Sequence, residues 1–480
     1  MKIKILGLLF ILGLVVVGCY KEFGFNDDLG YFQGGGDRFN DFEENPFIKV
    51  SDQPVSTFSI DADGASYAYV RRQLQTNALP VKAAVRTEEL INYFPLDYEQ
   101  PAGDDPVAVN GEVANCPWAQ GHQLIRIGLQ GKTIPDLPPS NIVLLLDVSG
   151  SMSSPDKLEL LKEGFNILVD QFDAQDRIAI VTYAGSAGVE LESTSGDEKN
   201  KIKKAINKLG SGGSTAGAEG IITAYEIAQE NFIEGGNNRI IIGTDGDFNV
   251  GPSSQEELVD LIKEKRELGI FITVLGVGIG NLNDAMLEQI ADNGNGTYEY
   301  IDHIEQAKKV FVYEFGKLYT VAKDVKVKVE FNPNMVSEYR LIGYENRLLT
   351  EEEFEADSTD AGEIGAGQNI TALYEIIPTN SGLDNLPTFT IDFKYKHPDS
   401  DTSIPLQLDI FDEGHSWSES SEAMRFTSSV AAYGLLLRDS EYKGTATFEQ
   451  VIDWAYGCTS YDPHGFRAEF IELLQKAKDL

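Results

Sequence analysis

The middle third of the chain repeats one pattern of hydrophobic and polar residues. Residues 141–146 are a nearly continuous aliphatic run, which is typical of a strand buried on both faces. Residues 157–172 then place Leu158, Leu161 and Phe165 on one face of a predicted helix. The succession continues with strands expected at 177–183, 239–242, 270–275 and 297–300 and helices at 198–209, 216–232, 255–268, 284–291 and from 304. This alternation predicts a mainly parallel sheet covered by helices on both faces.

Short oxygen-bearing side chains gather in three loops that this topology brings to one edge of the sheet. Asp147, Ser149 and Ser151 follow the first strand, Thr215 lies in the loop 210–217, and Asp245 follows the strand 239–242. Open sheets of this kind bind ligands at the carboxyl ends of their strands. Carboxylates and hydroxyls without thiols or imidazoles favour a hard cation, Mg²⁺ or alternatively Ca²⁺ or Mn²⁺. Helix capping by Asp147 and the serines is the alternative, and it would explain one loop but not three.

The same five residues resemble the metal-ion-dependent adhesion site of von Willebrand factor A domains. That resemblance implies that residues 138–305 form such a domain. It implies that Ser149, Ser151 and Thr215 supply hydroxyls to the metal, while Asp147 and Asp245 bind it directly or through water. It also implies a protein partner whose acidic residue completes the coordination sphere.

Further segments resemble the bacterial YfbK-like lipoproteins, in which an A domain lies between an N-terminal segment and a C-terminal domain. The segments that carry this resemblance are residues 56–63, 89–94, 245–251, 293–296 and 339–346. The resemblance extends from Ser56 to the end of the chain. It implies an architecture and leaves the biochemical role open.

Alternating residues on both sides of the A domain predict additional strands. These lie at 107–113 and 123–129 before it and at 325–331, 340–344, 368–377, 388–395 and 403–410 after it. We expect one β-sandwich built from both flanks, with the A domain inserted in a loop, and two separate small β units are the alternative. Helices are expected at 423–439, 448–456 and 465–478.

The predicted fold class is therefore α/β, a doubly wound von Willebrand A domain inserted in a β-sandwich, with a C-terminal helical region. The expected division of the chain is a signal peptide at 1–18, a flexible tether at 19–50, an N-terminal segment of helices and sandwich strands at 51–137, the A domain at 138–305, the continued sandwich at 306–415 and the helical domain at 416–480.

The N-terminus predicts export and a lipid anchor. Lys2 and Lys4 precede an apolar run at 5–17 that is too short to span a membrane. The residues before Cys19 resemble the lipobox of bacterial lipoproteins, which implies cleavage before Cys19 and its acylation with fatty acids such as palmitate. A simple signal peptide is the alternative. The resemblance to bacterial lipoproteins also implies that Tyr20, in place of an aspartate, favours the outer over the inner membrane of the cell envelope.

The charge of the chain excludes one class of partner. Lys and Arg number 39 against 76 Asp and Glu, which gives a formal net charge of −37. Non-specific nucleic-acid binding requires basic residues, so we expect no nucleic acid as a partner. Three cysteines rule out a disulfide scaffold, although Cys116 and Cys458 could pair in an oxidising envelope.

We expect a binding module and not an enzyme. A phosphatase of the haloacid-dehalogenase type needs a second carboxylate where Ser149 stands. Gly276, Gly278 and Gly280 suggest a dinucleotide fingerprint, but the third glycine comes one residue early, which favours close backbone packing instead. An envelope-assembly scaffold with a structural metal is the main alternative function, and a metal-dependent hydrolase is a weaker one.

Overall fold

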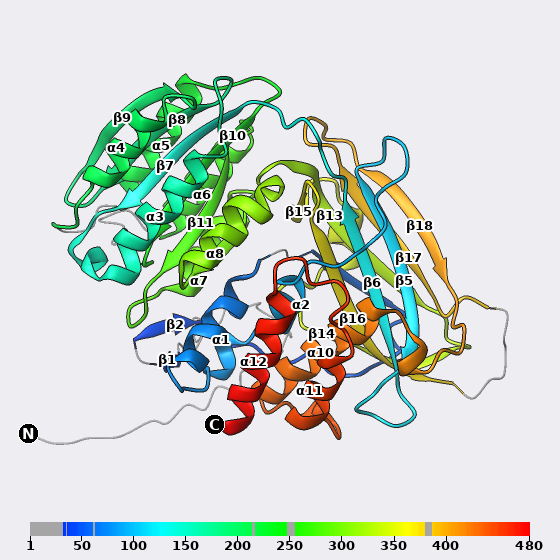
Figure 1. Ribbon diagram of the computed structural model, residues 1–480. Helices are drawn as coiled ribbons and strands as arrows, with labels where there is room; N and C mark the ends of the chain where they lie inside the picture. Colours follow the sequence, from blue (N-terminus) through cyan, green and yellow to red (C-terminus); the bar gives the residue numbers. More distant parts are fainter. Residues whose placement is uncertain (1–31, 35, 61–62, 214–216, 247–254, 380–385) are drawn as a thin grey trace, which may run out of the picture.

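Three parts of the molecule pack against one another in the computed structural model (Figure 1). It describes residues 32–34, 36–60, 63–213, 217–246, 255–379 and 386–480. An α/β domain carries the teal and green elements, a β-sandwich combines strands from both sides of that domain, and a helical layer joins the two ends of the chain.

The α/β domain is built on a six-stranded sheet in the order β12-β11-β10-β7-β8-β9. Every pair is parallel except β8 with β9. The strands are β7 (Ser140–Asp147), β8 (Arg177–Tyr183), β9 (Ala187–Ser195), β10 (Asn237–Thr244), β11 (Phe271–Val277) and β12 (Tyr298–Ile301). All residues of β7 and β10 are buried, as their aliphatic runs predict. The edge strand β9 was not predicted, because its residues are mostly half-buried or exposed.

Helices cover both faces of this sheet, and alternate residues of β7 divide between them. Leu144 belongs to the core cluster that contains residues of the helix α3, whereas Val143 and Leu145 belong to the cluster that contains residues of α5, α6 and α7. The helices are α3 (Leu160–Val169), α4 (Lys199–Lys208), α5 (Gly217–Glu230), α6 (Gln255–Arg266), α7 (Asp284–Asn293) and α8 (Ile304–Lys308). The predicted doubly wound α/β domain is therefore confirmed.

Two five-stranded sheets form the β-sandwich. One contains β4 (Val55–Ser59), β13 (Thr320–Phe331), β15 (Gly362–Gly365), β17 (Phe389–Lys396) and β18 (Ile404–Ile410), and the other contains β3 (Ile48–Lys49), β5 (Val107–Asn115), β6 (Gln123–Gly131), β14 (Val336–Ile342) and β16 (Asn369–Pro378). The strand β6 precedes the A domain, β16 follows it, and they pair antiparallel along their length. The A domain is thus inserted into the sandwich, and its two linkers meet where the Ser140 hydroxyl lies 2.9 Å from the Tyr319 hydroxyl.

The C-terminal helices pack with helices from the N-terminal segment. The layer contains α1 (Ala65–Gln75), α2 (Thr87–Asn92), α10 (Glu422–Leu437), α11 (Phe448–Tyr456) and α12 (Phe466–Asp479), while the short α9 (Glu351–Glu355) lies beside the sandwich. The Phe94 ring contacts those of Phe426 and Phe470, with centroids 4.9 and 5.4 Å away. Cys116 and Cys458 are buried free thiols in this core, so they do not pair. Across the described ranges, no helix is both long and apolar enough to cross a membrane.

The flexible tether predicted for residues 19–50 is wrong for its last part. Residues 37–39 form the strand β2 (Asp37–Phe39), which pairs with β1 (Phe32–Gly34). Asp37 and Phe39 are 3% and 1% exposed, because Phe39 packs in the core beside α1 and Asp37 accepts hydrogen bonds from the A domain. The polar composition of residues 19–50 predicted a tether and gave no sign of these contacts.

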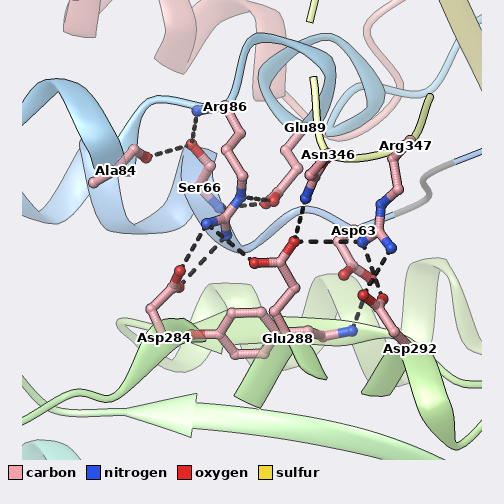
Figure 2. A network of polar contacts seen from close by, with 11 residues as sticks. Asp63, Ser66, Ala84, Arg86, Glu89, Asp284, Glu288, Asp292, Asn346 and Arg347 are labelled. Atoms are coloured by element: carbon pink, nitrogen blue, oxygen red, sulfur yellow. Dashed lines mark hydrogen bonds and ion pairs between the residues drawn. The ribbon is translucent and has the colours of Figure 1, made fainter. Parts of the chain in front are cut away.

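A buried ionic network fixes the A domain to the N-terminal segment and the sandwich (Figure 2). Arg86 contacts Asp284 at 2.7 Å and Glu288 at 3.7 Å, both on α7. Arg347 contacts Asp292 of the same helix at 2.7 Å, and the Asn346 amide donates to Glu288 over 2.7 Å. Burial raises the pKa of Glu288 to about 7, although Arg86 and Arg347 oppose this shift. One carboxylate of the network therefore titrates near neutral pH.

We predict that Glu288 makes the free energy of unfolding depend on pH, over the range between its pKa in the unfolded chain and its pKa in the folded protein. Because the folded pKa is raised above 4.5, the contribution of Glu288 is fully present below about pH 4.5 and is lost as pH rises through about 7. The free energy of unfolding of the wild type minus that of Glu288→Gln should fall by about 1–3 kcal/mol from pH 4.5 to 8, measured by urea unfolding. Glu190→Gln, an exposed substitution on β9, should show no such trend. A difference that is constant with pH would contradict this assignment.

Candidate metal centre

The predicted site lies at the carboxyl ends of β7 and β10, which are adjacent parallel strands. Asp147 is the last residue of β7, and Asp245 comes directly after β10. The register pairs Leu146 with Gly243, so the two carboxylates leave the same edge of the sheet. Both are 0% exposed. This edge is the switch point where the chain passes from one half of the sheet to the other, and it is where such sheets bind ligands.

Ser149 and Ser151 connect the two carboxylates. The Ser149 backbone N–H donates to Asp147 Oδ1 over 2.8 Å, and the Ser149 and Ser151 hydroxyl oxygens are 3.0 Å apart. The Ser151 hydroxyl also hydrogen-bonds the Asp245 carboxylate, and Thr244 Oγ1 donates to Asp147 Oδ2 over 3.1 Å. The Ser149 side chain makes no capping bond to the following 3₁₀ turn (Gly150–Ser153). Helix capping therefore does not account for Ser149.

The third predicted loop reaches the same place. Gly212 N–H donates to the Val148 carbonyl over 2.7 Å, and Gly150 N–H donates to the Gly213 carbonyl over 3.1 Å. The chain before Thr215 therefore lies against the loop that carries the serines. Thr215 itself lies outside the described residues, as does Cys19. The structure brings together the other four predicted residues, Asp147, Ser149, Ser151 and Asp245.

Two residues that the sequence did not indicate also contact Asp245. Lys157 Nζ donates to Asp245 Oδ2 over 2.9 Å, to the Ser151 carbonyl over 3.1 Å and to Asn281 Oδ1 over 2.7 Å. Asn281 Nδ2 donates to the same Asp245 oxygen over 3.0 Å. Lys157 begins a predicted amphipathic helix and Asn281 stands in a loop, so neither position carried a signal of this contact.

One glycine of the rejected dinucleotide motif, Gly278, makes room for the Lys157 side chain. Gly278 has a φ of +76°, and a Cβ added to it would lie 2.2 Å from Lys157 Cε. A side chain at this position would displace the lysine stem. The prediction of close backbone packing is confirmed at Gly278.

The two carboxylates differ in their electrostatic surroundings. Burial raises the pKa of Asp147 above its ordinary value, and the nearby Asp245 charge adds to this shift. Burial would also raise the pKa of Asp245, but hydrogen bonds from Asn281, Lys157 and Ser151 outweigh it and lower that pKa. Asp245 is therefore held as an anion by an ammonium and two neutral donors, whereas the neighbours of Asp147 are neutral donors and one like charge.

The donor set fits a hard divalent cation. Two serine hydroxyls and two carboxylates provide only oxygen, which suits Mg²⁺, Ca²⁺ or Mn²⁺ better than Zn²⁺. Within the described ranges, the hydrogen bonds to the carboxylate of Asp147 come from neutral groups, so a cation beside it would offset the cost of its burial. In the described part of the chain, no group of three or more His, Cys, Asp or Glu side chains could hold a metal ion. A site here would depend on hydroxyls as much as on carboxylates.

Three family models match the chain. The model described as von Willebrand factor type A domain matches residues 141–311, and the one described as von Willebrand factor matches residues 33–126. The model described as Uncharacterized protein YfbK, C-terminal, matches residues 316–388 and 384–480. The first match contains all five predicted metal residues.

Among similar proteins, Uncharacterized protein YfbK of Escherichia coli (strain K12) is 42% identical over 470 residues, which cover 92% of this chain and 81% of the relative. Uncharacterized protein sll0103 of Synechocystis is 27% identical over 43% of this chain and 48% of its own length. A solved structure described as von Willebrand factor type A from Catenulispora acidiphila covers 79% of this chain and 92% of its own, with 17% identity and a TM-score of 0.44. The chain belongs to the YfbK family of proteins with a von Willebrand factor type A domain.

Proposed function

We propose that this protein is an envelope-anchored binding module whose A domain holds a divalent cation, Mg²⁺ first among the candidates, and binds an acidic residue of a protein partner through it. Ser149, Ser151 and Thr215 supply hydroxyl ligands, and Asp147 and Asp245 supply carboxylates directly or through water. Bound at this edge of the sheet, the cation supplies a positive charge that attracts a carboxylate of the partner.

The convergence of four oxygen side chains carries this proposal. Asp147, Ser149, Ser151 and Asp245 come from two separate loops, yet they form one hydrogen-bonded cluster. Von Willebrand factor A domains generally mediate protein–protein interaction, and this chain contains one. The site residues then orient a partner and perform no covalent step, so we propose no enzymatic activity.

A cation at this site would also offset the repulsion between this acidic protein and an acidic partner. The chain has a formal net charge of −37, so its surface repels an acidic partner at long range. Ligation of a partner carboxylate is directional and strong at short range, and it selects partners that present an acidic side chain to this edge.

The anchor is the second part of the proposal. Cys19 follows a short apolar run and carries the lipid, which places the protein on a membrane face of the cell envelope, the outer membrane in preference to the inner.

The hydroxyl ligands provide the test of the metal site. The double variant Ser149→Ala/Ser151→Ala should weaken Mn²⁺ binding at least about tenfold, because two hard ligands are lost, as measured by calorimetry or electron paramagnetic resonance. Ser153→Ala is the matched control, since Ser153 lies in the same turn and is exposed. Capture of envelope proteins on the immobilised chain should fall with the double variant and with EDTA. Unchanged Mn²⁺ affinity in the double variant would refute the site.

The anchor has its own test. Cys19→Ser should abolish incorporation of labelled palmitate and release the protein from the membrane fraction, because the acylated residue is absent. Cys116→Ala serves as the control, since Cys116 is buried in the helical core. If the Cys19→Ser protein still carries labelled palmitate and stays in the membrane fraction, the proposed anchor is contradicted. The proposed metal site is unaffected by that result.

A further inference from the structure

The N-terminal strand β2 lies against the loop that contacts Asp245. Asp37 Oδ1 accepts hydrogen bonds from the backbone N–H groups of Gly280, over 2.6 Å, and Leu282, over 3.0 Å. These two donors stand on either side of Asn281. The carboxylate of Asp37 therefore fixes the backbone of the residue whose side chain contacts both Asp245 and Lys157.

Further contacts join the N-terminal strand and this loop. Arg38 N–H donates to the Leu282 carbonyl over 2.8 Å, and Arg38 forms an isolated parallel bridge with Asn283. Gly36 has a φ of +103°, and a Cβ added to it would lie 2.0 Å from the Gly280 carbonyl oxygen. The backbones touch at this point, so any side chain at residue 36 would separate them.

The opposite side of the loop touches the chain beside Asp245. Gly246 has a φ of +83°, and a Cβ added to it would lie 2.7 Å from the Asn283 nitrogen. The loop 278–283 is therefore held between residues 36–38 and residues 245–246. Close contacts therefore lead from residues 36–38 through Asn281 to Asp245.

Asp37 is itself held in place from the N-terminal helix. Tyr69 on α1 donates its hydroxyl to Asp37 Oδ2 over 3.0 Å, and its ring meets Phe39 edge-on at 4.8 Å. Asp37 is 3% exposed, and in the described part of the chain its hydrogen-bond donors are a phenol and two backbone amides, all neutral, so burying it is costly. Burial raises the pKa of Asp37, and the hydrogen bonds from Leu282, Gly280 and Tyr69 only partly offset this. A phenol and two amides around a buried carboxylate form a rigid clamp.

We infer that Asp37 is a positioning residue of the metal site, acting through Asn281 on Asp245, so that the N-terminal strand β2 sets the cation affinity of the A domain. This inference rests on the proposed metal-binding function. Asp37 lies 18 residues after Cys19 in the sequence.

The test is a double-mutant cycle on Mn²⁺ affinity in the full chain. Asn281→Ala should weaken binding about tenfold or more and Asp37→Ala about three- to tenfold, because each removes an outer contact that orients a ligand. If Asp37 acts through Asn281, the double variant should match Asn281→Ala alone, since the second loss has nothing left to disturb. Asp41→Ala is the matched control, because Asp41 is exposed on the same segment.

A second measurement follows the clamp itself in metal-free protein. Amide hydrogen exchange of residues 278–283 should accelerate in Asp37→Ala and stay unchanged in Asp41→Ala, because the side chain of Asp37 accepts two of the loop's N–H groups and alanine accepts none. Wild-type protein that binds no Mn²⁺ would overturn the proposed function and this inference together. Wild-type binding with an unchanged affinity in Asp37→Ala, or with additive effects in the double variant, would overturn this inference alone.

Discussion

Two buried carboxylates at one edge of a parallel sheet are the constraint on which the rest of the site depends. Asp147 and Asp245 are 0% exposed and belong to adjacent strands, so their charges are close and poorly solvated. Lys157 and Asn281 stabilise Asp245, while the donors that reach Asp147 from the described residues are neutral. The hydroxyls of Ser149 and Ser151 lie between them. A cation beside Asp147 would offset the cost of burying its negative charge, and this is the physical reason to place a cation here.

The inserted architecture gives this edge its surroundings. The chain leaves the sandwich to form the A domain and returns to it at a neighbouring point, where the hydroxyls of Ser140 and Tyr319 are hydrogen-bonded. The network of Arg86 and Arg347 with α7 holds the domain against the N-terminal segment and the sandwich. Arg71 on α1 adds a contact to Asp302 at 2.6 Å and to Glu469 of the C-terminal helix at 2.9 Å. The A domain is thus held by ionic contacts on several elements as well as by its two linkers.

Sequence reasoning predicted the parts that depend on local pattern. The buried strands β7 and β10 could be predicted because each is an aliphatic run in the sequence. The residues at their carboxyl ends lie close together because parallel strands end at the same edge of the sheet. Lys157 escaped prediction because its partners Asp245 and Asn281 lie 88 and 124 residues away. Asp37 escaped because its polar surroundings resemble a linker, and its two backbone donors are more than 240 residues distant. Contacts of that range leave no periodic trace in the sequence.

The central claim, that a hard cation binds among these side chains, is tested most directly by crystals of the full chain grown with Mn²⁺ and measured at the manganese absorption edge. The account predicts one strong anomalous peak beside the Ser149 and Ser151 hydroxyl oxygens, at the carboxyl ends of β7 and β10. An occupied manganese site elsewhere, with no peak beside these two serines at saturating Mn²⁺, would contradict it.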